Sequence, residues 1–250
     1  MPSSTDISGE PALPGIEIRR SRDRSRTRTS WLSSRHSFSF GDHYDPANIC
    51  FGALLVHNDD VIAPAAGFET HLHRDVEIVT WVLSGALTHR DSTGRSGVIE
   101  PGHAQRMSAG SGIWHSETNA GAEPVHYLQM WVRPDETLLE PTYQQQDVPA
   151  SALAGDWATV ASGMPQHADS AAVTVHQHQA ALHATRLTRG AAVELPTAPM
   201  VHVYVANGEL DLEGVGRLCA GDAARVRHAQ GQRLETASSA EVLAWELLAS

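Results

Sequence analysis

The feature that most restricts the fold of this chain is the short spacing between its turn-forming residues. Between residues 50 and 133, short β-type runs alternate with Gly, Pro, Asp and Asn. The runs are ICFGALLVHN, DVEIVTWVL, ALTHRD, GVIEPG and PVHYLQMWV. No long stretch carries the 3.6-residue apolar period of a helix, and similar strand-like runs follow from ALHATRLT to AEVLAWELL. Many short strands with frequent turns predict an all-β sandwich or barrel.

The two halves of the chain also resemble each other. VTWVLSGALTH (79–89) leads to a turn at Pro101-Gly102, and HVYVANGELDL (202–212) leads to one at Gly221-Asp222. In each half an apolar strand meets a turn with Gly85 or Gly208, and a second strand follows. A duplicated β-barrel explains this repeat, so we expect two barrels in tandem.

Composition excludes several classes of protein. The net charge is −11, which argues against direct binding to nucleic acid or to an anionic membrane. All 18 basic residues are Arg, so mechanisms that need a lysine amine, such as Schiff-base chemistry, are excluded. Cys50 and Cys219 form no CxxC pair and do not indicate a cysteine metal cluster. No apolar run suits a signal peptide or a membrane span, so we expect a cytoplasmic protein.

Two segments near the start of the chain have a biased composition. Residues 1–16 are rich in Ser, Pro and Gly, and we expect a disordered tail. Seven Arg follow between Arg19 and Arg35. We interpret this segment as one or two strands with Arg on the solvent face and with Trp31, Phe38 and Phe40 packed inward.

The pattern that carries chemistry is a pair of alternating motifs. GFETHLHRDVE contains His71 and His73, and AGSGIWHSETN contains His115 and Glu117 about 40 residues later. On a strand, residues i and i+2 share a face and lie about 7 Å apart along the chain, so both side chains can reach one ion. Two such strands facing each other would supply three nitrogens and one carboxylate oxygen.

That donor set suits several divalent transition metals and does not select among them by affinity. We take Fe(II) as the first candidate, with Ni, Mn, Cu, Co and Zn as alternatives. Four protein ligands leave an octahedral ion two open positions for water, dioxygen or a substrate.

These residues also carry a family resemblance. The spacing Gly67-x3-His71-x-His73-x3-Glu77-x7-Gly85 resembles the first cupin motif, and Gly110-x-Gly112-x2-His115-x3-Asn119 resembles the second. HSFSFGDHYDP (36–46), the segment 58–85 and MSAGSGIWHSE (107–117) are similar to the pirin family, in particular to its bacterial two-cupin branch of quercetin 2,3-dioxygenases. The likeness is strong over about residues 17–145 and continues to the end as a shorter cupin.

The resemblance implies a fold and a function. It implies two tandem cupin barrels of the double-stranded β-helix type, at 17–145 and 146–250, with PTYQQQDVPA (141–150) as a polar linker. By the same resemblance His71, His73, His115 and Glu117 are the metal ligands, and Glu77 has a structural role. The implied reaction opens the ring of a flavonol such as quercetin with O2 and releases carbon monoxide.

Glu117 is then both a ligand and a candidate base for the flavonol 3-hydroxyl. We expect burial beside apolar groups such as Trp114 to raise its pKa. Trp81 and Trp114 flank the ligands, and we interpret them as core residues rather than as walls of a substrate pocket.

Two other function classes use the same ligands. Pirins also resemble redox-responsive regulators that act through a protein partner, and cupins include isomerases and metal-dependent hydrolases. Anaerobic loading with metal, followed by quercetin and air, would separate these alternatives.

A control within the chain limits the number of sites. His176-x-His178 repeats the local spacing, but no HxE motif follows it, so we expect no metal there. Counting from the second Gly turns, the positions equivalent to the four ligands hold Glu194, Pro196, Leu234 and Thr236. We therefore predict one metal site per chain and a second barrel without metal.

Overall fold

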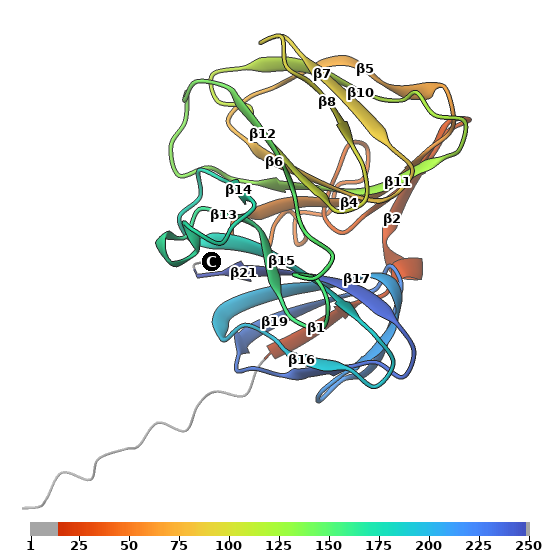
Figure 1. Ribbon diagram of the computed structural model, residues 1–250, viewed down its shortest axis with the longest axis vertical. Coiled ribbons are helices and arrows are strands. Elements are labelled where there is room, and N and C mark those ends of the chain that lie inside the picture. Colours follow the sequence, from red (N-terminus) through yellow and green to blue (C-terminus); the bar gives the residue numbers. More distant parts are fainter. Residues whose placement is uncertain (1–14, 249–250) are drawn as a thin grey trace, which may run out of the picture.

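The computed structural model describes residues 15–248, which fold almost entirely into strands. Within that range there is no α-helix, and the only helical turns are two 3-10 turns, η1 (Ser21–Asp23) and η2 (Pro165–His167). No helix among these residues is long and apolar enough to cross a membrane. Two β-barrels lie against each other (Figure 1), which confirms the expected all-β fold of two cupin barrels.

The first barrel consists of two antiparallel sheets. Its larger sheet, in spatial order, contains β12 (Thr142–Asp147), β9 (His103–Ser108), β6 (Glu77–Ser84), β11 (Val125–Val132), β4 (Leu54–Ile62), β3 (Leu32–His36) and β2 (Ser25–Arg28). Its smaller sheet contains β5 (Ala66–His73), β10 (Ile113–Asn119), β7 (Leu87–Asp91) and β8 (Ser96–Ile99). The larger sheet faces the second barrel, and the smaller sheet forms the far wall (Figure 1).

The second barrel repeats this arrangement. Its inner sheet contains, in order, β1 (Gly15–Arg19), β19 (Ala223–Ala229), β17 (Ala198–Leu212), β21 (Ala240–Leu247), β15 (Ala180–Leu187), β13 (Ala158–Ser162) and β14 (Val173–Thr174). The outer strands are β16 (Ala192–Glu194), β18 (Gly216–Cys219) and β20 (Arg233–Glu235). The long strand β17 belongs to both walls, because one end pairs with β19 and the other with β18.

The glycines that marked the repeat in the sequence have the same backbone conformation. Gly85 has a φ of 77° and Gly208 a φ of 76°, a region that side-chain-bearing residues rarely adopt. Gly85 lies between β6 and β7, whereas Gly208 lies inside the continuous strand β17, so the expected turn at Gly208 was wrong. At both positions the backbone before the opposite strand lies so close that a Cβ atom would clash with a carbonyl oxygen. The same steric requirement in each half supports the interpretation as a duplication.

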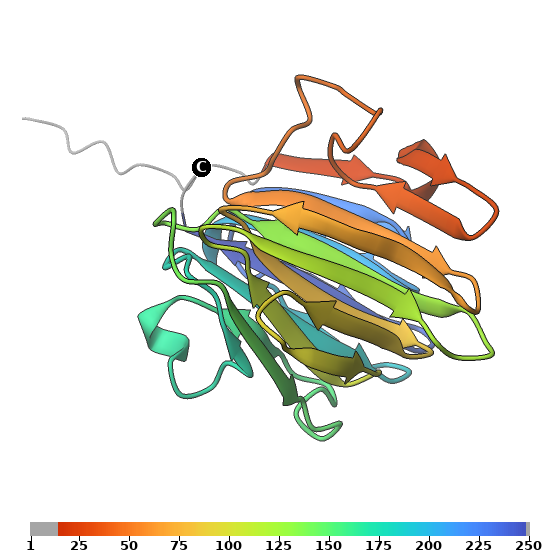
Figure 2. The ribbon, with the colours of Figure 1, turned by 90° about the horizontal axis from the view of Figure 1, so that it is seen from above.

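The main hydrophobic core lies between the two barrels. Leu54, Trp81 and Met130 of the first barrel pack in one cluster with Leu182 and Trp245 of the second. Seen from above in Figure 2, strands of the first barrel lie over strands of the second. The contact between the barrels is therefore a hydrophobic core. Burying side chains of this size stabilises it by about 1.5–3 kcal/mol each.

Polar groups at the edge of this core also join the barrels. The Tyr204 hydroxyl donates to Asp59 Oδ2 at 2.5 Å and accepts from Arg24 Nη1 at 2.9 Å. Trp81 Nε1 donates to Glu241 Oε1 at 2.8 Å. Arg24 is buried here, so the expectation of solvent-facing arginines was wrong for this residue.

The strand pairing differs from the expected domain boundaries at both ends of the first barrel. Strand β1, which includes Gly15 and Ile16 of the expected tail, pairs with β19 of the second barrel. The rest of that tail, residues 1–14, lies outside the described residues. The expected linker contains strand β12, which pairs with β9 and extends the first barrel to Asp147. β12 is an edge strand with mostly exposed residues, so it has no apolar alternation that the sequence could show.

Candidate metal centre

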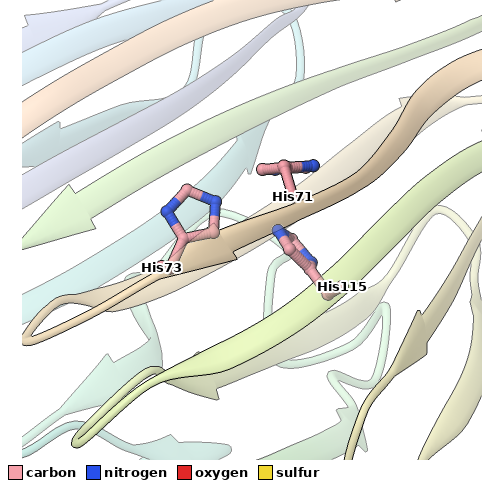
Figure 3. Close-up of side chains that lie close together, drawn as sticks. All are labelled: His71, His73 and His115. Atoms are coloured by element: carbon pink, nitrogen blue, oxygen red, sulfur yellow. The ribbon is translucent and has the colours of Figure 1, made fainter.

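Two neighbouring strands of the smaller sheet bring three imidazoles together. His71 and His73 lie on β5, and His115 lies directly opposite His71 on β10. The ring centroids are 4.5 Å apart for His71 and His115, 4.8 Å for His71 and His73, and 4.9 Å for His73 and His115. The three rings point toward one another in Figure 3, and one nitrogen of each lies within 4.8 Å of the others. The alternation of the two strands thus places these residues together as the sequence predicts.

The hydrogen bonds of these rings leave the Nε2 atoms free. Nδ1 of His71 lies 2.7 Å from the carbonyl oxygen of Glu69, which can only accept, so Nδ1 carries the proton. Nε2 of His73 and Nε2 of His115 are buried without a hydrogen-bond partner among the described residues. Buried nitrogens without a partner are costly unless something binds them. The three rings therefore fit a divalent ion.

A residue that the sequence interpretation missed fixes the ring of His115. Buried His89, on β7, donates from Nε2 to Asp91 Oδ2 at 3.1 Å. Burial lowers the pKa of His89, so the ring is neutral and its Nδ1 accepts from His115 Nδ1 at 3.4 Å. That arrangement turns the lone pair of His115 Nε2 toward the other two rings, which is how supporting groups orient metal-bound histidines. The sequence signal that could have identified this pair is the i, i+2 spacing of His89 and Asp91 in ALTHRD, which places both side chains on one face of the strand.

Glu117 lies deeper in the barrel than the three histidines. A register shift in the pairing of β10 with β5 falls between His115 and Glu117, so Glu117 lies opposite Phe68. One of its oxygens lies within 4.8 Å of ligand atoms of His89 and His115. Gln129 donates to Oε2 of Glu117 at 2.6 Å, which leaves Oε1 to turn toward an ion. The structure thus groups Glu117 with His115 and His89 and not with His71 and His73, and its role as fourth ligand stays a prediction.

Burial raises the pKa of Glu117 to about 7. The hydrogen bond from Gln129 lowers it, and the negative charge of Asp60 raises it. Trp114 does not contribute as we expected, because its side chain points outward and is 51% exposed. Successive side chains of a strand point to opposite faces. His115 and Glu117 face inward, so Trp114, which directly precedes His115 on β10, faces solvent.

A cavity of about 320 Å³ opens onto this centre. Its volume falls at the lower end of the ~300–1,000 Å³ that small-molecule sites occupy. His71, His73 and Glu117 line it together with apolar and polar side chains from other strands. The apolar lining is Leu32, Phe40, Phe68 and Trp131, and the polar lining includes Thr27, Ser34, His36, Asp42, Asn58, Asp60 and Gln129. The cavity is thus suited to a flat aromatic molecule with a few hydroxyl groups.

Most of these cavity residues were not identified from the sequence. Trp131 contacts the ring of His73 edge-on at 4.9 Å, and Asp60 is buried at the cavity wall. Phe40 lines the cavity and does not pack into the core. His36, Phe40 and Asp42 belong to the segment 36–46. The similarity of that segment to pirins was the one sequence signal that could have identified them as cavity residues.

The remaining candidate residues serve structure. Trp81 is fully buried in the core between the barrels, as expected. Glu77 is buried and accepts hydrogen bonds from Ser108 and from the backbone of His176. His178 bonds to Asp135 across the same interface at 2.7 Å. The HxH pair at 176–178 therefore connects the two barrels.

The matching region of the second barrel contains no such imidazole group. Its strands β16 and β20 pair with each other, as β5 and β10 do. Leu195 and Leu234 are buried there in an apolar cluster, and Glu194 is exposed. Among the described residues, this pair of strands therefore contributes aliphatic side chains to a core and no histidine.

Comparisons with known proteins agree with this geometry. The family model described as "Pirin" matches residues 17–132, and the one described as "Quercetinase C-terminal cupin domain" matches residues 159–247. A Mycobacterium tuberculosis protein, named as a candidate quercetin 2,3-dioxygenase, is 57% identical over 93% of this chain and 95% of its own length. The Escherichia coli quercetin 2,3-dioxygenase is 45% identical over 52% of this chain and 57% of its own.

A solved structure resembles the whole described fold. The crystal structure of the bacterial pirin YhhW from Escherichia coli, in complex with nickel(II), superposes with a TM-score of 0.86. It is 34% identical in sequence and covers 94% of this chain and 100% of its own.

Proposed function

The chain belongs to the pirin family, and we propose from this premise that it is a metal-dependent dioxygenase that cleaves quercetin-like flavonols with O2 and releases carbon monoxide. One observation supports this most directly: the imidazoles of His71, His73 and His115 converge at an aromatic cavity that buried Glu117 also lines. The names of the relatives support the same class of substrate.

His71, His73, His115 and Glu117 would hold the ion. We take Fe(II) first, with Ni as the alternative that the nickel complex of YhhW supports. A bound divalent ion supplies a Lewis acid for the flavonol 3-hydroxyl and a centre for activating dioxygen.

The cavity side chains would bind and orient the substrate. Phe40, Phe68 and Trp131 offer apolar faces to the flavonol rings, which excludes water from the reacting carbon atoms. Oδ1 of Asn58 is hydrogen-bonded to Nδ1 of His36, which leaves the Asn58 amide nitrogen to donate to a ring hydroxyl at the same wall. Each of these groups comes from a strand or from the loop after β3, so a rigid sheet fixes most of the pocket.

Glu117 would take the proton of the 3-hydroxyl. Its carboxylate lines the cavity, and a pKa of about 7 allows it to accept a proton near neutral pH. The Gln129 amide donates to Oε2 and fixes the orientation of the carboxylate.

The test is anaerobic loading of the metal-free protein with Fe(II) or Ni(II), followed by quercetin and air. We expect carbon monoxide release and loss of the flavonol absorbance. Metal binding without turnover of several flavonols would contradict the proposal. That result would favour the alternative, a redox-sensing pirin that acts through a protein partner with the same four ligands.

A further inference from the structure

A second group of metal-binding side chains lies in the second barrel, away from the positions equivalent to the first centre. His183 is on β15, Glu246 is on β21, and His167 ends the 3-10 turn η2. One ligand atom of each lies within 4.8 Å of the other two. Two strands and a turn that are remote in sequence bring them together, so no local motif in the sequence indicated this group.

The group faces the inside of the second barrel. Leu182 and Trp245 are paired neighbours that point into the core between the barrels. His183 and Glu246 follow them on the two strands and point to the opposite side, where Ala244 belongs to the apolar cluster of the second barrel. The side chains of His183 and Glu246 are only 7% and 13% exposed. Little water therefore reaches the space between them.

Hydroxyl groups hold the far side of both imidazoles. Nδ1 of His183 lies 3.3 Å from Thr159 Oγ1, and Nδ1 of His167 lies 3.1 Å from Ser162 Oγ. When Nδ1 donates to a hydroxyl, Nε2 carries the lone pair that a metal needs. Nε2 of His183 lies 3.1 Å from Glu246 Oε2 and donates to it, so a metal ion bound between them would replace this proton.

The charge of the group is suited to a cation. Among the described residues, Glu246 forms an ion pair only with His183, which carries a charge only when it is protonated. Two neutral imidazoles and one carboxylate leave a single negative charge in a poorly hydrated place. Two histidines and one carboxylate are a common ligand set for zinc and other divalent ions of similar hardness.

We propose that His167, His183 and Glu246 bind a second divalent transition-metal ion, for which Zn²⁺ serves as the probe. The ion would leave one position open to water or a small ligand, and it would tie the turn η2 to the sheet. This site revises the expectation of one metal per chain, because that count examined only the positions equivalent to the first centre.

The experiment uses the full chain with His71→Ala and His115→Ala, so that the first centre no longer competes for metal. After removal of metal, Zn²⁺ is titrated by calorimetry, and the bound zinc is counted by elemental analysis. We expect one Zn²⁺ per chain, and an affinity at least about 100-fold lower once His167→Ala is added. Because no flavonol is used, the result does not depend on the proposed activity.

Matched variants separate the site from general binding by histidine. Glu246→Gln keeps the shape of the side chain but removes the charge, and it should also weaken binding. His178→Ala removes an exposed histidine of the same barrel and should leave binding unchanged. Absence of zinc from the background variant, or zinc binding that survives His167→Ala, would overturn the proposal. If the background variant does not fold, the same count on the native chain must fall from two ions to one with His167→Ala.

Discussion

The two barrels share one strand arrangement but use their interiors in different ways. In the first barrel, β5 and β10 direct histidines and Glu117 inward, toward an open cavity. In the second, the paired strands β16 and β20 contribute Leu195 and Leu234 to a closed apolar cluster. Polar side chains appear in the second barrel on the opposite wall, at His183 and Glu246. The barrel topology therefore supplies a set of inward-facing positions, and the side chains at a few of them decide whether the interior is a site or a core.

The largest effect should come from a ligand of the first barrel. His115→Ala removes one nitrogen and leaves His89 without its partner. We expect metal content to fall to a small fraction and flavonol turnover to fall on the order of 10³-fold. Elemental analysis and an oxygen-uptake assay measure both quantities. Full occupancy and turnover in this variant would show that the first barrel is not the site.

The equivalent region of the second barrel should respond in stability instead. Leu234 is fully buried, so Leu234→Ala should lower the free energy of unfolding by about 2–5 kcal/mol. Urea denaturation measures this change. Val98→Ala on the first barrel is the control, because Val98 is half exposed and should change stability by less than about 0.5 kcal/mol. A variant at Leu234 as stable as the native chain would refute the assignment of this region as core.

A third substitution separates the role of Glu117 as a metal ligand from its role as a base. Glu117→Gln keeps an oxygen for the ion but cannot take a proton, so turnover should fall about 100-fold while metal content is largely retained. Glu194→Gln, which changes an exposed carboxylate of the second barrel, should change neither quantity. Unchanged turnover with full metal occupancy in Glu117→Gln would exclude Glu117 as the base.

The smallest effect concerns the junction on which both barrels depend. Tyr204→Phe removes the hydroxyl that joins Arg24 to Asp59 and leaves a buried guanidinium with one acceptor fewer. We expect a loss of about 1–2 kcal/mol in the free energy of unfolding, measured in urea, with metal content unchanged. A loss of metal from this variant would mean that the junction and the first centre are coupled.

The sequence predicted those features that depend on local periodicity. Alternation along a strand was enough to place His71 with His73 and His115 with Glu117, because each pair needs only one strand to share a face. The same rule makes Trp114 exposed, and applying it strictly would have corrected our expectation for that residue.

Features that depend on strand order could not be predicted in the same way. Trp131 comes from β11, Asp60 from β4 and His89 from β7, and only the sheet arrangement brings them to the centre. His167, His183 and Glu246 are a stronger case, because they meet through the packing of η2 on two paired strands. A single sequence shows periodicity along one strand but not which strands become neighbours.

Strand β1 has a consequence for how the protein is made. Ile16 pairs with Val226, so β1 leaves the ribosome long before the strand with which it pairs. Until that strand has been synthesised, β1 has no partner and the second barrel cannot close. Contacts between such remote positions slow folding, and we expect the pairing of β1 with β19 to be a late step in the folding of the molecule.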